Sequence, residues 1–129
     1  MNISITTETF HQDDQSWLGS AHATTATRTI TLDTSAFTPA THYPGGYFPS
    51  GLPLGKITTT GKYGPYDNTA EDGRDTLTGF LFTAVKAPAS TTTDVGAALF
   101  EHGRIVEARL PIAIDAAGKT DVAARITFI

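Results

Sequence analysis

Four acidic side chains fall within residues 67–75, where two of them could form the carboxylate pair that glycoside hydrolases use. They are Asp67, Glu71, Asp72 and Asp75. Arg74 is interleaved with them and reduces their mutual repulsion, and the surrounding residues are polar turn formers. We therefore interpret this segment as a solvated turn between two strands, and we expect the protein not to be an enzyme.

Histidines are the other residues with obvious chemistry, because imidazole nitrogens bind divalent metals. The chain has His11, His22, His42 and His102, and His11 is followed by Asp13 and Asp14. A tight site needs three or four ligands on a rigid scaffold, whereas His11 and His22 both lie in a Thr-rich segment with few large apolar side chains. We expect no metal site and no cofactor.

The sequence Gly51–Lys56 has only a superficial similarity to a phosphate-binding loop. Its glycines are one residue too close, Pro53 has no backbone N–H, and Ile57 occupies the position of the magnesium-binding hydroxyl. We expect a loop that enters a strand. The chain has no G-x-S-x-G nucleophile motif and no cysteine, so thiolate chemistry and disulfides are excluded.

Length and composition predict one folded domain. The chain has 129 residues, 40% of them hydrophobic, with seven Phe, 23 Thr and 17 Ala and only 17% charged residues. A net charge of −4 offers no basic surface for nucleic acid or anionic lipid, and no run approaches the ~20 apolar residues of a membrane span. The N-terminus lacks the basic and apolar regions of a secretory signal, so we expect synthesis in a cytoplasm.

Residues 1–25 are predicted to form an extended, flexible arm. Their apolar side chains are too sparse to offset the roughly 1–2 kcal/mol per residue that ordering a backbone costs. Ile3 and Ile5 alternate with polar residues, a pattern that allows a strand to form against a partner. Phe10 and Trp17 are expected to anchor the arm in pockets of that partner. Deleting residues 1–17 should therefore leave the rest of the chain folded.

Residues 26–129 are predicted to form a compact, mainly β body. Strands are expected at 28–32, 54–63, 77–87 and 126–129, and 77–87 is apolar on both faces, which indicates a central strand with Phe80 and Phe82 buried. Residues 95–100 and 104–110 are expected to pair as a hairpin around Gly103. Residues 39–55 are expected to be an irregular loop, and one helical turn is expected from Thr120 to Ala124.

Short motifs in a consistent order give the chain a resemblance to a known family. The arm contains Glu8-Thr9-Phe10 and then Ala21-His22-Ala23-Thr24. The body contains Gly-Lys-Ile-Thr at 55–58, Gly-Pro-Tyr-Asp at 64–67, Gly-Phe-Leu-Phe at 79–82 and Val-Gly-Ala-Ala-Leu-Phe-Glu-His-Gly at 95–103. From about residue 5 to the end, the chain resembles the lambda-type head decoration proteins of tailed phages, and most closely those of phages that infect actinobacteria.

This resemblance implies a fold, an assembly and a place in the virion. It implies a β-clip-like mixed β fold, a homotrimer, and binding to the major capsid protein at quasi-threefold sites on the outer surface of an expanded head, after synthesis in the host cytoplasm. Such a protein would cement the capsid lattice without binding DNA directly. The capsid-binding residues would lie in the arm: Ile3, Ile5, Thr7, Glu8, Thr9, Phe10, Trp17 and His22.

Two other functions remain open on the sequence alone. The aromatic residues of the Tyr43–Phe48 loop, if exposed, would suit a tail or fibre module that contacts host carbohydrate. The loop carboxylates at 67–75 would be needed for a small hydrolase.

Overall fold

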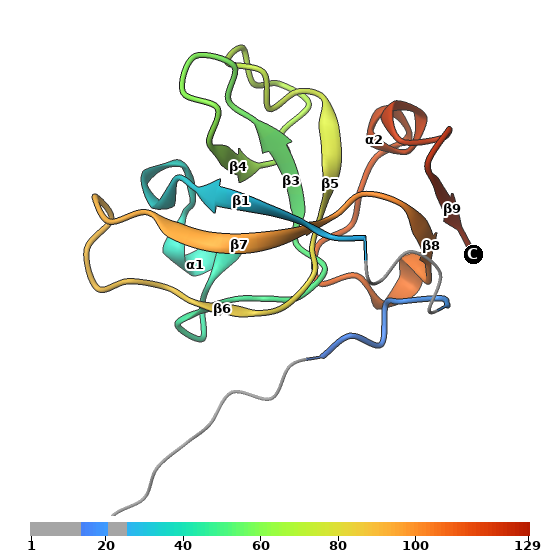
Figure 1. The fold of residues 1–129 in the computed structure, drawn as a ribbon, viewed down its shortest axis with the longest axis horizontal. Helices are drawn as coiled ribbons and strands as arrows, with labels where there is room; N and C mark the ends of the chain where they lie inside the picture. The colour runs from blue at the N-terminus through green and yellow to red at the C-terminus, as the bar shows by residue number, and fades with distance from the viewer. Residues whose placement is uncertain (1–13, 21–25) are drawn as a thin grey trace, which may run out of the picture.

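A five-stranded closed barrel forms the centre of the molecule (Figure 1). The computed structural model describes residues 14–20 and 26–129. Around the barrel the strands follow the order β1-β4-β3-β5-β7, in which only the β1–β4 pairing is parallel. Their bounds are β1 Arg28–Leu32, β3 Pro53–Lys56, β4 Tyr63–Pro65, β5 Leu77–Leu81 and β7 Val95–Phe100. The mainly β class predicted from the sequence is confirmed.

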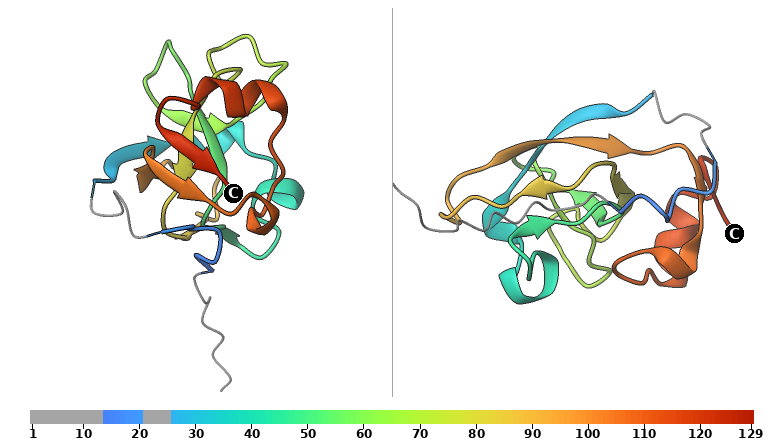
Figure 2. Two further views of the ribbon diagram at one scale, coloured as in Figure 1. Left: turned by 90° about the vertical axis from the view of Figure 1, so that its right-hand side faces the viewer. Right: turned by 90° about the horizontal axis from the view of Figure 1, so that it is seen from below.

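Two small sheets and two short helices complete the described part of the fold. Strand β2 (Tyr47–Phe48) pairs antiparallel with β6 (Val85–Lys86), and β8 (Gly103–Ile105) pairs parallel with β9 (Ile126–Phe128). Helix α1 spans Pro39–His42 and helix α2 spans Ala116–Asp121. The views in Figures 1 and 2 place α2, β8 and β9 together at one end of the barrel.

The core is divided into two clusters by β5 and β7. Leu81 and Leu99 point into the barrel cluster, whereas Leu77, Phe80 and Phe100 point into the cluster beneath α2 and β9. A strand buried on both faces needs apolar side chains on each, which explains the Leu and Phe residues of β5. Phe80 is fully buried, as predicted, but the single strand predicted over 77–87 is wrong, because β5 ends at Leu81 and β6 belongs to another sheet. Phe82 lies beyond the end of β5 and is only half-buried.

The predicted hairpin over residues 95–110 is wrong. Both edges of β7 are occupied inside the barrel, by β1 on one side and by β5 on the other. Strand β8 therefore leaves the barrel and pairs with β9, and the Gly103 amide donates to the Arg125 carbonyl at 3.1 Å. Gly103 does adopt the positive φ expected of it, at 144°.

Three other local predictions also need correction. The run predicted as one strand over 54–63 is a hairpin, in which β3 ends at Lys56, residues Thr58–Gly61 turn, and β4 begins at Tyr63. The predicted irregular loop at 39–55 contains α1, β2 and most of β3. The helical turn predicted from Thr120 to Ala124 is misplaced: helix α2 begins after Asp115, which caps its N-terminus by accepting the Gly118 amide at 2.8 Å, and it ends at Asp121.

No helix in the described ranges 14–20 and 26–129 is long and apolar enough to cross a membrane. The two α-helices have four and six residues.

Candidate functional site

Residues 14–20 pack against the body rather than forming part of an extended arm. We call this segment the strap. Trp17 has no exposed surface, and its indole packs edge-on against Phe100 at 5.2 Å and tilted against Phe80 at 6.1 Å between ring centroids. The expectation that Trp17 anchors the chain in a pocket of a partner is therefore wrong, because the indole already fills the core of its own body.

Hydrogen bonds join the strap to two parts of the body. The Trp17 indole N–H donates to Ser50 Oγ at 2.9 Å, and the Gln15 amide and the Ser50 hydroxyl both donate to the Phe82 carbonyl, at 2.7 and 2.6 Å. On the other side, the Val106 amide donates to the Trp17 carbonyl at 2.7 Å. The Gly19 amide donates to the Arg104 carbonyl at 2.9 Å, next to an antiparallel bridge between Leu18 and Ile105.

Gly51 is the residue that makes room for the Trp17 ring. Its φ is +89°, and a Cβ at this position would lie 2.9 Å from two atoms of the indole and 3.0 Å from Pro111. Gly51 therefore packs beneath the strap and, with Leu52, leads into β3 at Pro53, which agrees with the predicted entry into a strand. The sequence signal for a packed strap was the adjacent pair Trp17-Leu18, the first two neighbouring large apolar side chains in the chain.

The other predicted capsid-binding residues lie outside the described part of the chain. These are Ile3, Ile5, Thr7, Glu8, Thr9, Phe10 and His22. The strand-like pattern at 3–6 and the possible ligands His11 and Asp13 lie outside it as well. Among these candidate positions the structure describes Trp17 and Asp14.

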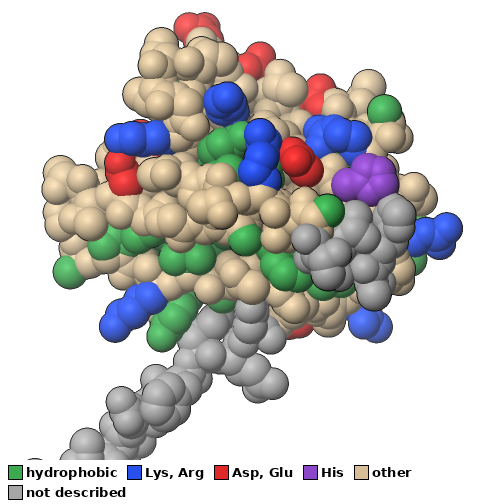
Figure 3. Space-filling view, in the orientation of Figure 1, with side chains coloured by type: hydrophobic (Ala, Val, Ile, Leu, Met, Phe, Trp, Pro, Cys, Tyr) green, Lys and Arg blue, Asp and Glu red, His purple; other side chains and the backbone are tan. Residues whose placement is uncertain are grey.

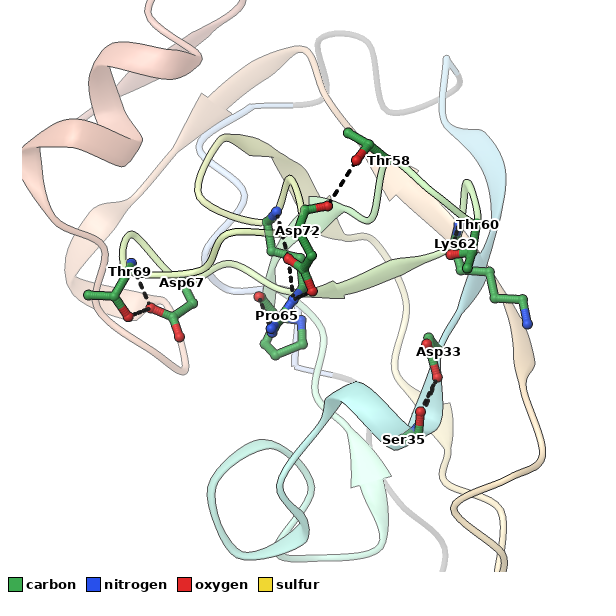
Figure 4. A network of polar contacts seen from close by, with 10 residues as sticks. Asp33, Ser35, Thr58, Thr60, Lys62, Pro65, Asp67, Thr69 and Asp72 are labelled. Carbon is green, nitrogen blue, oxygen red and sulfur yellow. Dashed lines mark hydrogen bonds and ion pairs between the residues drawn. The ribbon is translucent and has the colours of Figure 1, made fainter.

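The acidic loop at 67–75 is held by local hydrogen bonds (Figure 4). Asp67 accepts the amide and hydroxyl of Thr69 at 2.9 and 2.7 Å, and these bonds lower the pKa of its carboxyl. Asp72 pairs with the Arg74 guanidinium at 2.9 Å; partial desolvation opposes the effect, yet the hydrogen bonds from Arg74 lower its pKa overall. A glycosidase general acid needs a raised pKa, so neither Asp67 nor Asp72 fits that role.

The other two candidate sites were a metal site built from histidines and acidic residues and a carbohydrate-binding loop at Tyr43–Phe48. Across residues 14–20 and 26–129 no three His, Asp or Glu side chains are grouped as metal ligands. The Tyr43–Phe48 loop is largely internal, because Tyr43 is 8% exposed, Phe48 is fully buried and Tyr47 is half-buried. The condition for the carbohydrate-binding alternative, exposed aromatic side chains, is therefore not met at Tyr43 and Phe48.

The described residues form a small barrel whose N-terminal segment, the strap, is packed against it. The model of the family named Bacteriophage lambda head decoration protein D matches residues 5–126. The chain therefore belongs to the phage head decoration protein family, a structural family whose members bind the phage capsid. No curated protein sequence matches the chain.

Proposed function

We propose that this protein binds the expanded head of a tailed phage at its quasi-threefold sites as a homotrimer, and that it stabilises the capsid lattice from outside. The family match over residues 5–126 carries the proposal, because it includes nearly all of the N-terminal segment as well as the barrel. The major capsid protein is the proposed partner, and neither nucleic acid nor membrane is bound directly.

The capsid-binding residues in this proposal are those ahead of the strap, with His22 behind it. Ile3 and Ile5 would form one side-chain row of a strand added to the capsid protein, the segment Thr7-Glu8-Thr9 would continue it, and Phe10 would be its anchor. The strap supports this division of roles, because Trp17 fixes the base of the arm to the body. Three arms on one trimer would raise avidity by about 10²–10⁴ over a single arm.

Co-sedimentation with purified heads tests the proposal. The protein should sediment with expanded heads and remain in the supernatant with unexpanded ones, and chemical cross-linking of the head-bound protein should give trimers. Phe10→Ala should weaken binding by about 2 kcal/mol per arm, or roughly 30-fold in Kd. Thr92→Ala, on the exposed β6–β7 loop, is the matched control and should bind as the parent does. Equal binding to both kinds of head would refute the proposal.

A further inference from the structure

An apolar groove of about 300 Å³ lies beside β2, on the surface of the body. Prolines from three segments line it together with one tyrosine and one isoleucine: Pro44, Tyr47, Pro49, Pro111 and Ile112. Figure 3 shows hydrophobic side chains along the lower edge of this face, where β2 and β6 lie in Figure 1. Proline and tyrosine rings provide flat apolar walls that suit an aromatic side chain.

Two cationic residues neighbour residues that line the groove. Lys86 is the cross-strand partner of Tyr47, so the two side chains project from the same face of the β2–β6 sheet. Arg109 precedes the groove residue Pro111 by two positions. Both are exposed, and neither forms a salt bridge within the described part of the chain.

The described chain begins near residues that adjoin the groove-lining residues in sequence. Gln15 shares its acceptor, the Phe82 carbonyl, with Ser50, whose neighbour Pro49 lines one wall. On the other side, the carboxyl pKa of Asp14 is lowered by hydrogen bonds from Ser16 and, to a smaller extent, by the positive charge of Arg109. The start of the described chain, at Asp14 and Gln15, therefore lies near sequence neighbours of both Pro49 and Pro111.

We propose that in the free protein residues 8–13 of the same chain dock in this groove, with the Phe10 ring against its prolines and Tyr47. Phe10 is four residues from Asp14, a reach of about 13–14 Å for an extended chain. The segment carries Glu8 and Asp13 and no Lys or Arg, which complements Lys86 and Arg109. Because a short tether gives the segment an effective concentration in about the millimolar range at the groove, a weak contact between the two is enough to keep the groove occupied.

Docking would cover the aromatic side chain of the arm until another binding partner competes for it. The inference concerns the protein in the absence of capsids and goes beyond the proposed capsid function. The two can therefore fail independently: a free groove would leave capsid binding possible, and docking could occur in a protein that bound no head.

Methyl NMR of the full-length protein, without capsids, tests the docking. Ile112 lines the groove, and an aromatic ring packed on its δ1-methyl group shifts that resonance upfield. We expect Phe10→Ala to move the Ile112 resonance downfield, by the same amount at every protein concentration, and Lys86→Glu to move it part of the way. Lys56→Glu makes the same charge change on exposed β3 residue Lys56, outside the groove, and should leave it in place.

Two results would overturn the inference. An Ile112 resonance that is unchanged in Phe10→Ala would show that the ring does not enter the groove. A shift that disappears on dilution would show that the groove is filled by a second copy rather than by the chain's own arm.

Discussion

Trp17 is the residue on which the N-terminal part of the fold depends. Its ring is fully buried, and its N–H is paired with Ser50. We expect Trp17→Ala to lower the free energy of unfolding by roughly 3–5 kcal/mol, the usual cost of truncating a large buried side chain. Trp17→Phe keeps most of the packing and loses the hydrogen bond, which costs about 1 kcal/mol beyond the lost volume.

Urea denaturation measures both losses. Phe82→Ala is the comparison variant, because this ring stacks on Phe100 at 6.2 Å but is only half-buried, so it should cost clearly less than Trp17→Ala. A loss for Trp17→Ala no larger than that for Phe82→Ala would mean that the indole does not hold the strap in solution.

His42 makes stability depend on pH. Its Nδ1 accepts the Thr38 amide at 2.8 Å, and burial, followed by the positive charge of Arg74, lowers its pKa below the ordinary 6.5. Because the folded pKa lies below the unfolded one, the unfolded state binds the proton more readily. The contribution of His42 to stability is therefore constant above about pH 7 and falls as pH drops from about 6.5 through the folded pKa.

Urea midpoints at about pH 7.5 and about pH 5 check this dependence. In His42→Asn the side-chain oxygen can still accept the Thr38 amide but does not titrate, so the fall should be smaller. The remaining histidines are unchanged in the variant, so the difference between the two proteins belongs to His42. An identical fall in both proteins would contradict the prediction.

At the scale of elements, Gly73 locks the acidic loop onto the β3–β4 hairpin. Its φ is +110°, and a Cβ would lie 2.5 Å from the Lys56 carbonyl oxygen. Gly61 also has a positive φ, +74°, but nothing lies within 4 Å of its Cβ position. We expect Gly61→Ala to cost about 1–2 kcal/mol from backbone strain alone, and Gly73→Ala to cost roughly 3 kcal/mol or more because a backbone segment must also move.

Thermal unfolding of the two alanine variants makes the comparison directly. The backbone strain is of the same kind at both sites, so the difference in Tm reports the close approach of the loop to β3. Equal Tm values would show that the acidic loop can move away from β3 without a loss of stability.

The spacing of apolar residues in the sequence identified the strands whose burial can be inferred from their own side chains. Strand β1 alternates and was predicted with its observed bounds, and β5 was recognised because both of its faces are apolar. Strand pairing was predicted wrongly where strands distant in sequence compete for the same partner. Strand β8 pairs with β9 rather than with β7 because both edges of β7 are already occupied, and the residues next to β8 in sequence do not indicate this. The Thr58–Thr60 run favours a strand by composition, yet the Ile57–Lys62 hydrogen bond closes a turn there.

At the scale of the molecule, the strap sets where the arm ends and the body begins. The sequence predicted an arm of residues 1–25 whose first 17 residues could be removed without harm. The structure moves the body's boundary to residue 14 at the latest, because Gln15, Trp17 and Gly19 all bond to the barrel or to β8. The error arose because Trp17 stands in a polar context, and its core neighbours Phe80 and Phe100 are remote in sequence.

Two truncations test this boundary. A protein that begins at Asp14 should keep its Tm within a few degrees of the full chain, whereas one that begins at Ala21 should lose the equivalent of Trp17→Ala or more, since a buried indole and its hydrogen bonds are removed together. Differential scanning calorimetry gives both values. If the protein that begins at Ala21 melts as the full chain does, the strap is not part of the folded body.

The double attachment of the strap also decides how the molecule would carry a mechanical load. A pull on the chain ahead of Asp14 reaches the body along two routes: through Gln15 and the Trp17 indole to Phe82 and Ser50, and through the Trp17 carbonyl and Gly19 to β8. Strand β8 transmits its part of the force to β9, near the C-terminal end of the chain, because the two strands are paired. Tension on the N-terminus is thus divided between the barrel and the C-terminal sheet, so a tether under strain would have to break both attachments before either sheet could be peeled open.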